Sequence, residues 1–174
     1  MYLRSSNIQL RAPELGDLDY LIHVENDTRL WAVSACKVPY SRYRMQQYIE
    51  GNANDIYADR QLRLMAELHA DGQLAGIVDL FDFSPADRKA EMGMVVDPRH
   101  RGKGYGREML DLLCQYAENV LDLHQLYVYI FEDNTSARNL FSSSGFQLTA
   151  ILPDWVFSEK KFRSVCLYQR IFEK

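Results

Sequence analysis

The chain has 174 residues, of which 47% are hydrophobic and 25% are charged, and its formal net charge is −4. This length and composition are typical of a soluble globular protein and exclude an extended disordered chain. The acidic balance disfavours nucleic acid and anionic membrane surfaces as partners, and we expect neither. We expect one domain over residues 1–174.

The cysteines and histidines give no indication of a metal site. Cys36, Cys114 and Cys166 are far apart, and the four histidines are widely separated, so we expect reduced core thiols and no metal. The N-terminus lacks the features of a targeting peptide, and no run approaches the roughly 20 apolar residues that span a bilayer. These features predict cytoplasmic localisation.

The first third of the chain predicts one strand and two helices. The strand begins at residues 8–11, and apolar residues at helical spacing over 14–24 predict the first helix. Ser41 is placed to cap the second helix at its N-terminus. We expect the two helices to pair.

The middle of the chain predicts a β-hairpin and a further strand. Apolar and polar residues alternate over 61–68, and a turn at Asp71-Gly72 leads to a strand over 75–83. The next strand, over 90–96, ends at Asp97-Pro98 because proline cannot donate a ladder hydrogen bond.

The last third continues the alternation and completes an α/β fold. Apolar residues recur at helical spacing over 106–123, which predicts an amphipathic helix. Asn134 or Thr135 is placed to cap a shorter helix, and Gly145 is placed to end it. The remaining segments predict strands over 125–131, 146–152 and 165–172.

A glycine-rich turn joins the strand at 90–96 to the long helix. Its sequence is Arg101-Gly102-Lys103-Gly104-Tyr105-Gly106, followed by Arg107. A helix N-terminus after such a turn presents free backbone N–H groups where the helix dipole is positive, so the turn predicts a phosphate-binding site. The glycine spacing fits neither a P-loop nor a dinucleotide fingerprint. An ordinary glycine-rich turn with solvated charges is the alternative.

Two motifs in the expected order resemble those of the GCN5-related N-acetyltransferase (GNAT) family. Arg101, Gly104 and Gly106 fit the pattern [RQ]-x-x-G-x-[GA], and residues 134–146 are similar to N-x-x-A-x-x-x-Y-x-x-x-G-F. The resemblance extends over 8–168. Residues 90–98 and 157–163 resemble the branch that contains spermidine or diamine N-acetyltransferases and ribosomal-protein N-terminal acetyltransferases.

The resemblance implies a fold, a reaction and a set of cofactor contacts. The fold is a mixed, mostly antiparallel twisted sheet of about six or seven strands flanked by about four helices. The reaction is acetyl transfer from acetyl-CoA to a primary amine, by direct attack in a ternary complex. The implied coenzyme A contacts are Val95, Val96, Arg101, Gly102, Lys103, Gly104, Tyr105, Gly106, Arg107, Asn134 and Arg138. Asn134 is also compatible with a plain helix cap.

Three carboxylates are candidates for the catalytic base. An alkyl ammonium has a pKa of about 10.4, so a base or a proton path must help the amine to attack. Asp79, Asp82 and Glu91 lie on paired strands, and Asp79 and Asp82 should face opposite sides unless a bulge intervenes. We favour Asp82, because Leu80 and Phe83 are expected to surround it with apolar surface that raises its pKa. A solvated strand-end carboxylate is the alternative.

Position 141 departs from the family pattern. Many relatives carry a tyrosine there that protonates the leaving thiolate, whereas this chain has Phe141. We expect Phe141→Tyr to raise turnover if the new hydroxyl reaches the thiolate. Tyr127, Tyr129 and Phe131 alternate on one strand, and core packing is expected for them.

The acceptor is the least determined feature. A small amine or polyamine is expected, and a protein N-terminal amine is the alternative; a non-catalytic module that binds acetyl-CoA is a third hypothesis, because Phe141 has no proton to give. The connector over 30–40 has no acidic residue and includes Lys37, which weakens the argument for a polyamine. A homo-oligomer is left open.

Overall fold

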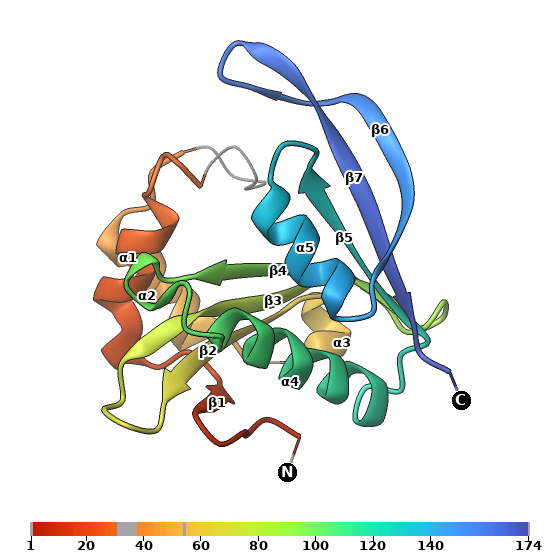
Figure 1. Cartoon of the computed structure of the whole chain (residues 1–174). Helices are drawn as coiled ribbons and strands as arrows, with labels where there is room; N and C mark the ends of the chain where they lie inside the picture. The colour runs from red at the N-terminus through yellow and green to blue at the C-terminus, as the bar shows by residue number, and fades with distance from the viewer. Residues whose placement is uncertain (1, 31–37, 54, 174) are drawn as a thin grey trace.

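The computed structural model describes residues 2–30, 38–53 and 55–173. These residues contain a seven-stranded sheet in the order β1-β2-β3-β4-β5-β7-β6 (Figure 1). Its neighbouring strands are antiparallel except for the parallel pair β4 and β5. The strands are β1 (Ile8–Arg11), β2 (Leu62–Leu68), β3 (Leu74–Ser84), β4 (Lys89–Val96), β5 (Gln125–Phe131), β6 (Gln147–Ser158) and β7 (Lys161–Ile171). The predicted mixed, mostly antiparallel sheet is therefore confirmed.

The helices begin and end close to the predicted positions. Ser41 caps α2 by accepting a hydrogen bond from the Arg44 N–H, and Asn134 caps α5 by accepting one from the Ala137 N–H. The predicted caps are therefore confirmed. The α-helices in the described residues are α1 (Leu18–Glu25), α2 (Arg42–Gly51), α3 (Ile56–Asp59), α4 (Tyr105–Asn119) and α5 (Thr135–Ser143).

Three differences from the predicted elements have local causes. The short helix α3 was not predicted; the Asp55 carboxylate holds it by accepting from two N–H groups of its first turn. Helix α4 ends at Asn119, before the predicted end at 123, and Asp122 nearby has a φ of 53°. Strands β6 and β7 are longer than predicted, because Glu159 and Lys160 both adopt positive φ and close a tight turn.

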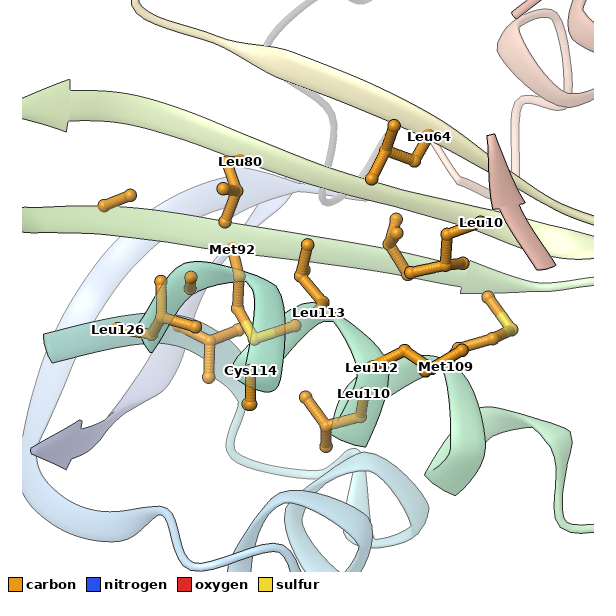
Figure 2. Close-up of a cluster of buried hydrophobic side chains, with 14 of the residues drawn as sticks. Leu10, Leu64, Leu80, Met92, Met109, Leu110, Leu112, Leu113, Cys114 and Leu126 are labelled. Carbon is orange, nitrogen blue, oxygen red and sulfur yellow. The ribbon is translucent and has the colours of Figure 1, made fainter. Parts of the chain in front are cut away.

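Helices cover both faces of the sheet. Helices α4 and α5 pack on one face through a core to which β3 contributes Val78 and Leu80 (Figure 2). Helices α1 and α2 pack together on the other face, with Ile77 of β3 in a second core. The expected pairing of the two helices is confirmed. Side chains alternate along β3, so the even residues 78 and 80 face α4 and the odd residue 77 faces α1.

The remaining sequence predictions concern the cysteines and the membrane. Cys114 and Cys166 are buried free thiols, as predicted, whereas Cys36 and Lys37 lie outside the described residues. No helix in the described parts of the chain has both the length and the hydropathy that a membrane crossing needs.

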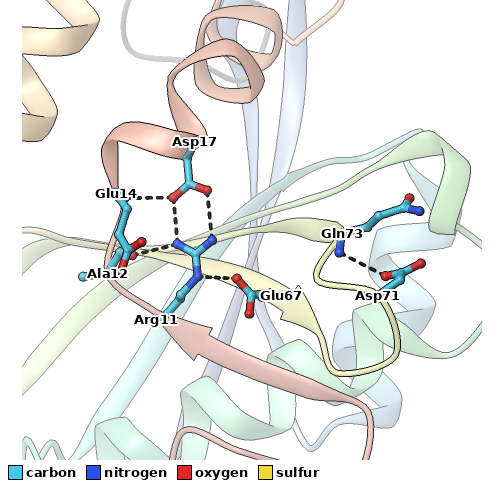
Figure 3. Close-up of polar contacts among 7 residues, drawn as sticks. All are labelled: Arg11, Ala12, Glu14, Asp17, Glu67, Asp71 and Gln73. Carbon is cyan, nitrogen blue, oxygen red and sulfur yellow. Dashed lines mark hydrogen bonds and ion pairs between the residues drawn. The ribbon is translucent and has the colours of Figure 1, made fainter.

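A polar network fixes the start of α1 against the sheet. Arg11 at the end of β1 donates from Nη1 and Nη2 to Asp17, at 2.7 and 2.9 Å, and from Nε to Glu67 of β2 at 2.6 Å (Figure 3). Asp17 is buried and immediately precedes α1. Asp71 accepts from the Gln73 N–H at 3.0 Å in the β2–β3 turn, which is the predicted hairpin turn. The Arg11 network therefore ties β1 to β2 and to the residue that precedes α1.

Candidate active site

The parallel strands β4 and β5 separate along their length (Figure 1). They pair over only three registers, the last of which is Glu91 with Tyr127, although the strands continue to Val96 and Phe131. The other edge of β4 pairs with β3 throughout this segment. Backbone N–H and C=O groups require hydrogen-bond partners, so the separated edges can receive an extended ligand. The residue pair Glu91 and Tyr127 marks the closed end of this opening.

The glycine-rich turn lies at the other end of β4. Gly102 and Gly104 have φ of 73° and 86°, in the left-handed region that glycine adopts without strain. Gly104 is the N-cap of α4, so the free N–H groups of the first helical turn begin here. A Cβ at either glycine would meet no atom within 4 Å, so space is open around both residues. This geometry is that of an anion site at a helix N-terminus.

The third glycine of the turn has a packing role. A Cβ at Gly106 would lie 3.2 Å from Val96 Cγ2 and 3.5 Å from Leu140 Cδ2. Its missing side chain therefore allows α4 to begin close against β4 and α5. Tyr105 beside it is half-buried, and its ring lies edge-on to that of His100, with the centroids 6.0 Å apart.

The basic residues of the turn are held differently. Arg101 donates from Nε to the Val96 carbonyl at 3.2 Å, and Lys103 is exposed. Arg107 is engaged with Asp111 at 2.9 Å and with Ser143 of α5 at 3.2 Å. The charge of Arg107 is therefore offset by a carboxylate, whereas Arg101 is engaged with a carbonyl group.

A cavity of about 270 Å³ adjoins the turn on the α1 face. It is lined by Tyr20, His23, Val24, Asp27, Arg29, Leu30, Val95, Asp97, Pro98 and Arg101. Burial first, and then the charge of Asp97, raises the pKa of Tyr20. Val95 and Arg101, both predicted to contact the cofactor, therefore share one hollow with α1.

The two predicted contacts from the second motif lie beyond the end of β5. Asn134 is exposed and its side chain caps α5. Arg138 donates from Nε to the Tyr168 hydroxyl at 3.1 Å and from Nη1 to the Glu132 carbonyl at 2.9 Å. These bonds hold α5 against the C-terminal end of β5, at the open end of the separated strands.

Asp79 is occupied by a buried ion pair. Arg63 of β2 donates from Nε and Nη2 to the two Asp79 oxygens at 2.7 and 3.0 Å, and from Nη1 to Glu25 of α1. Burial raises the pKa of Asp79, and the Arg63 guanidinium opposes that rise. With both oxygens engaged, this carboxylate ties β3 to β2 and α1.

Asp82 is exposed, so the prediction that apolar side chains surround it is wrong. A β-bulge shifts the register between Phe81 and Ser84, and Asp82 has a φ of 47°. Leu80 and Phe83 are buried in the core on the α4 side, whereas Asp82 accepts a hydrogen bond from the Tyr127 hydroxyl at 2.9 Å. Asp79 and Asp82 were expected to face opposite sides of the sheet unless a bulge intervened, and the structure has such a bulge.

Glu91 completes a cluster at the closed end of the opening. It is half-buried on β4, in register with Phe81 on one side and Tyr127 on the other. Burial, and then the negative charge of Asp82, raises its pKa. Asp82, through its hydrogen bond, and Glu91, through its register, therefore both lie beside Tyr127 at the closed end of the opening. Tyr127 was predicted from sequence to pack in the core; instead it is half-buried, donates to Asp82 and lies in register with Glu91.

Phe141 is a core residue. Its side chain is 4% exposed, and its ring packs edge-on against Phe146 with the centroids 5.1 Å apart. Both residues belong to the core beneath α4 and α5.

Phe141→Tyr is therefore expected to destabilise the fold without accelerating acetyl transfer. A hydroxyl placed in this core without a partner costs about 1–3 kcal/mol. Urea unfolding should show a loss of that size, and single-turnover kinetics should show no faster acetyl transfer. A faster step would instead indicate that position 141 reaches the leaving group, as in the original expectation.

Together, the separated parallel strands and the glycine-rich helix N-terminus define an α/β protein whose sheet opens between β4 and β5, next to a helix N-terminus. The family model "Acetyltransferase (GNAT) domain" matches residues 7–147, and the chain belongs to this family. It is an acetyl-CoA-dependent N-acetyltransferase.

Several relatives are similar to this chain over nearly their whole length. The spermidine N(1)-acetyltransferase of Vibrio cholerae is 26% identical to this chain, over 92% of this chain and 91% of its own length. That of Escherichia coli K12 is also 26% identical, over 94% of this chain and 87% of its own length. The ribosomal-protein-serine acetyltransferase of E. coli is 21% identical over 97% of this chain and 95% of its own. A crystal structure of the V. cholerae spermidine N-acetyltransferase with CoA and spermine has a TM-score of 0.85 at 24% identity, covering 96% of each chain. This chain therefore has the same fold as that enzyme.

Proposed function

We propose that the chain transfers an acetyl group from acetyl-CoA to a primary amine of a small amine of the polyamine class. The observation that carries the proposal is the pair of carboxylates, Asp82 and Glu91, at the closed end of the separated strands. Two negative charges attract an alkyl ammonium and can accept its proton. The spermidine acetyltransferases among the relatives support this acceptor class.

In this proposal the cofactor runs from the glycine-rich turn to the carboxylate pair. The backbone N–H groups of residues 102–106 hold the pyrophosphate, with Arg101 and Lys103 offsetting its charge; the Arg107 N–H already donates to the Gly104 carbonyl at 3.1 Å. The pantetheine arm lies along Val95 and Val96, at the β4 edge that β5 leaves unpaired. Asn134 and Arg138 flank the same opening from α5. A main-chain N–H at this free edge of β4 stabilises the oxyanion.

The attack is direct, within a ternary complex. Only about one alkyl amine in a thousand is unprotonated near pH 7.4, a cost of roughly 4 kcal/mol. Glu91, with its raised pKa, is the better placed acceptor for that first proton. The amine then attacks the thioester carbonyl, the C–N bond forms, and the C–S bond breaks.

A panel of acceptors tests the proposed substrate class. The purified protein is mixed with acetyl-CoA and, separately, with spermidine, spermine, a diamine and peptides with free N-terminal serine or alanine. We expect thiol release and acetylated product to be fastest with the polyamines. Faster acetylation of a peptide would move the assignment to protein N-termini, and no release with any amine would favour a binding module.

Asp82→Asn is expected to slow acetyl transfer and to change its pH dependence. Without the Asp82 charge the pKa of Glu91 falls, so Glu91 is ionised at lower pH and the acidic limb of kcat/KM moves to lower pH. Coenzyme A affinity should change little, because Asp82 is far along β3 from the glycine-rich turn. The matched variant Asp79→Asn should keep the wild-type pH profile, since Arg63 holds both Asp79 oxygens. The reverse pattern would assign the role to Asp79.

A further inference from the structure

We propose that the Tyr127 hydroxyl delivers the proton to the leaving thiolate, in a relay with Asp82. This inference rests on the proposed function. The thiolate of coenzyme A gains a proton as the C–S bond breaks, and a positioned general acid accelerates that step. Phe141 has no hydroxyl and lies in the core against Phe146. Position 141 therefore supplies no acid.

The position of Tyr127 follows from the sheet. It is the last residue of β5 that pairs with β4, so a thioester lying along the free edge of β4 ends beside it. Its neighbours Leu126 and Val128 point into the α4 core, which places Tyr127 on the opposite face, with α1 and α2. The amine is attracted to the same face by Asp82, whose carboxylate accepts from the Tyr127 hydroxyl at 2.9 Å.

The ring of Tyr127 is held in place by its neighbours. It meets the ring of Tyr129 edge-on at 5.9 Å between centroids, and Tyr129 stacks on Trp155 of β6 at 6.3 Å. A fixed ring and a fixed hydrogen bond give the hydroxyl a defined orientation, which proton transfer requires.

The proton balance closes without a further reagent. The ammonium gives its first proton to Glu91, which releases it to water. After the amine has attacked, its second proton goes to the Asp82 carboxylate as the electron pair of the C–S bond moves to sulfur. Protonated Asp82 then donates to the Tyr127 oxygen, and the original Tyr127 proton goes to the thiolate. Asp82 and Tyr127 return to their starting states, and the products are the amide and the thiol.

The electrostatics of the resting site are consistent with this order of steps. Burial, the hydrogen bond to Asp82 and the charges of Asp82 and Glu91 raise the pKa of Tyr127, so the phenol holds its proton before reaction. Protonation of Asp82 removes the negative charge that raises the pKa of Tyr127. This happens at the stage when Tyr127 gives its proton to the thiolate.

The test compares Tyr127→Phe with Tyr129→Phe, two changes that each remove one hydroxyl from the same face of β5 and keep the ring. Single-turnover acetyl transfer is measured with acetyl-CoA and the fastest amine of the acceptor panel. We expect Tyr127→Phe to slow this step by about 10²-fold or more, and to make it depend on the concentration of an acidic buffer. Tyr129→Phe should remain close to wild type. Coenzyme A affinity should be the same in both.

The double variant Asp82→Asn/Tyr127→Phe separates a relay from two independent roles. Residues that act as one unit are non-additive, so the double variant should be about as slow as the slower single variant. Losses that multiply, or a Tyr127→Phe variant with a wild-type rate or without buffer dependence, would overturn the relay while leaving the proposed function intact. A wild-type protein that acetylates no amine would overturn both.

Discussion

Gly104→Val is expected to weaken coenzyme A binding by about tenfold to a hundredfold. Gly104 has a φ of 86°, and a residue with a branched Cβ pays about 1–3 kcal/mol to adopt that backbone conformation. Relaxing the strain would turn the N–H groups at the start of α4 away from the pyrophosphate. Since about 1.4 kcal/mol corresponds to tenfold in affinity, this strain accounts for the expected loss.

The matched control is Gly72→Val. Gly72 lies in the turn between β2 and β3, has a φ of 71°, and like Gly104 has no atom within 4 Å of an added Cβ. The substitution therefore imposes a similar backbone strain away from the glycine-rich turn. Calorimetry should show wild-type coenzyme A affinity for Gly72→Val and a reduced affinity for Gly104→Val. Equal affinities for wild type and Gly104→Val would refute the assignment of this turn to the cofactor.

Arg63→Ala is expected to lower the free energy of unfolding by about 3–5 kcal/mol, the usual cost of removing one partner from a buried ion pair. The side chains of Arg63, Asp79 and Glu25 are only 17%, 10% and 16% exposed. Alanine would leave two carboxylates that share a site with no cation between them. Burial disfavours the charge on Arg63, but the carboxylates of Asp79 and Glu25 more than offset that effect and raise its pKa.

An exposed ion pair provides the comparison. Arg42 of α2 pairs with Asp19 of α1, and these side chains are 62% and 81% exposed. Such pairs contribute about 0–1 kcal/mol, so Arg42→Ala should change stability little. Urea unfolding measures both variants. Similar losses for the two would show that the Arg63 network does not hold α1 to the sheet as described.

Those parts of the site that are formed by residues adjacent in the chain could be predicted from the sequence. The glycine-rich turn, the helix that follows and the Asn134 cap are encoded by adjacent residues whose backbone preferences act over a few positions. The hairpin formed by β2 and β3 likewise follows from alternation around the turn at Asp71-Gly72.

The arrangement of the catalytic cluster could not be predicted in the same way. The bulge beside Asp82 puts a non-glycine residue at positive φ, which no local preference of aspartate requires. The separation of β4 from β5, and the register that sets Tyr127 beside Glu91, depend on segments that are far apart in the chain: Glu91 and Tyr127 are 36 residues apart (127 − 91). Phe141 could be recognised as a departure from the family pattern, but its burial against Phe146 needed the structure.

Initial-rate kinetics with both substrates varied distinguish direct attack in a ternary complex from a covalent acetyl-enzyme. We expect thiol release to require the amine and the acetylated amine to accumulate with it. We also expect double-reciprocal lines to intersect, as they do when both substrates are bound before the acetyl group moves. Parallel lines, which indicate a covalent acetyl-enzyme, would contradict direct attack beside Asp82 and Glu91. Thiol release that proceeds at the same rate without an amine would contradict amine acetylation itself.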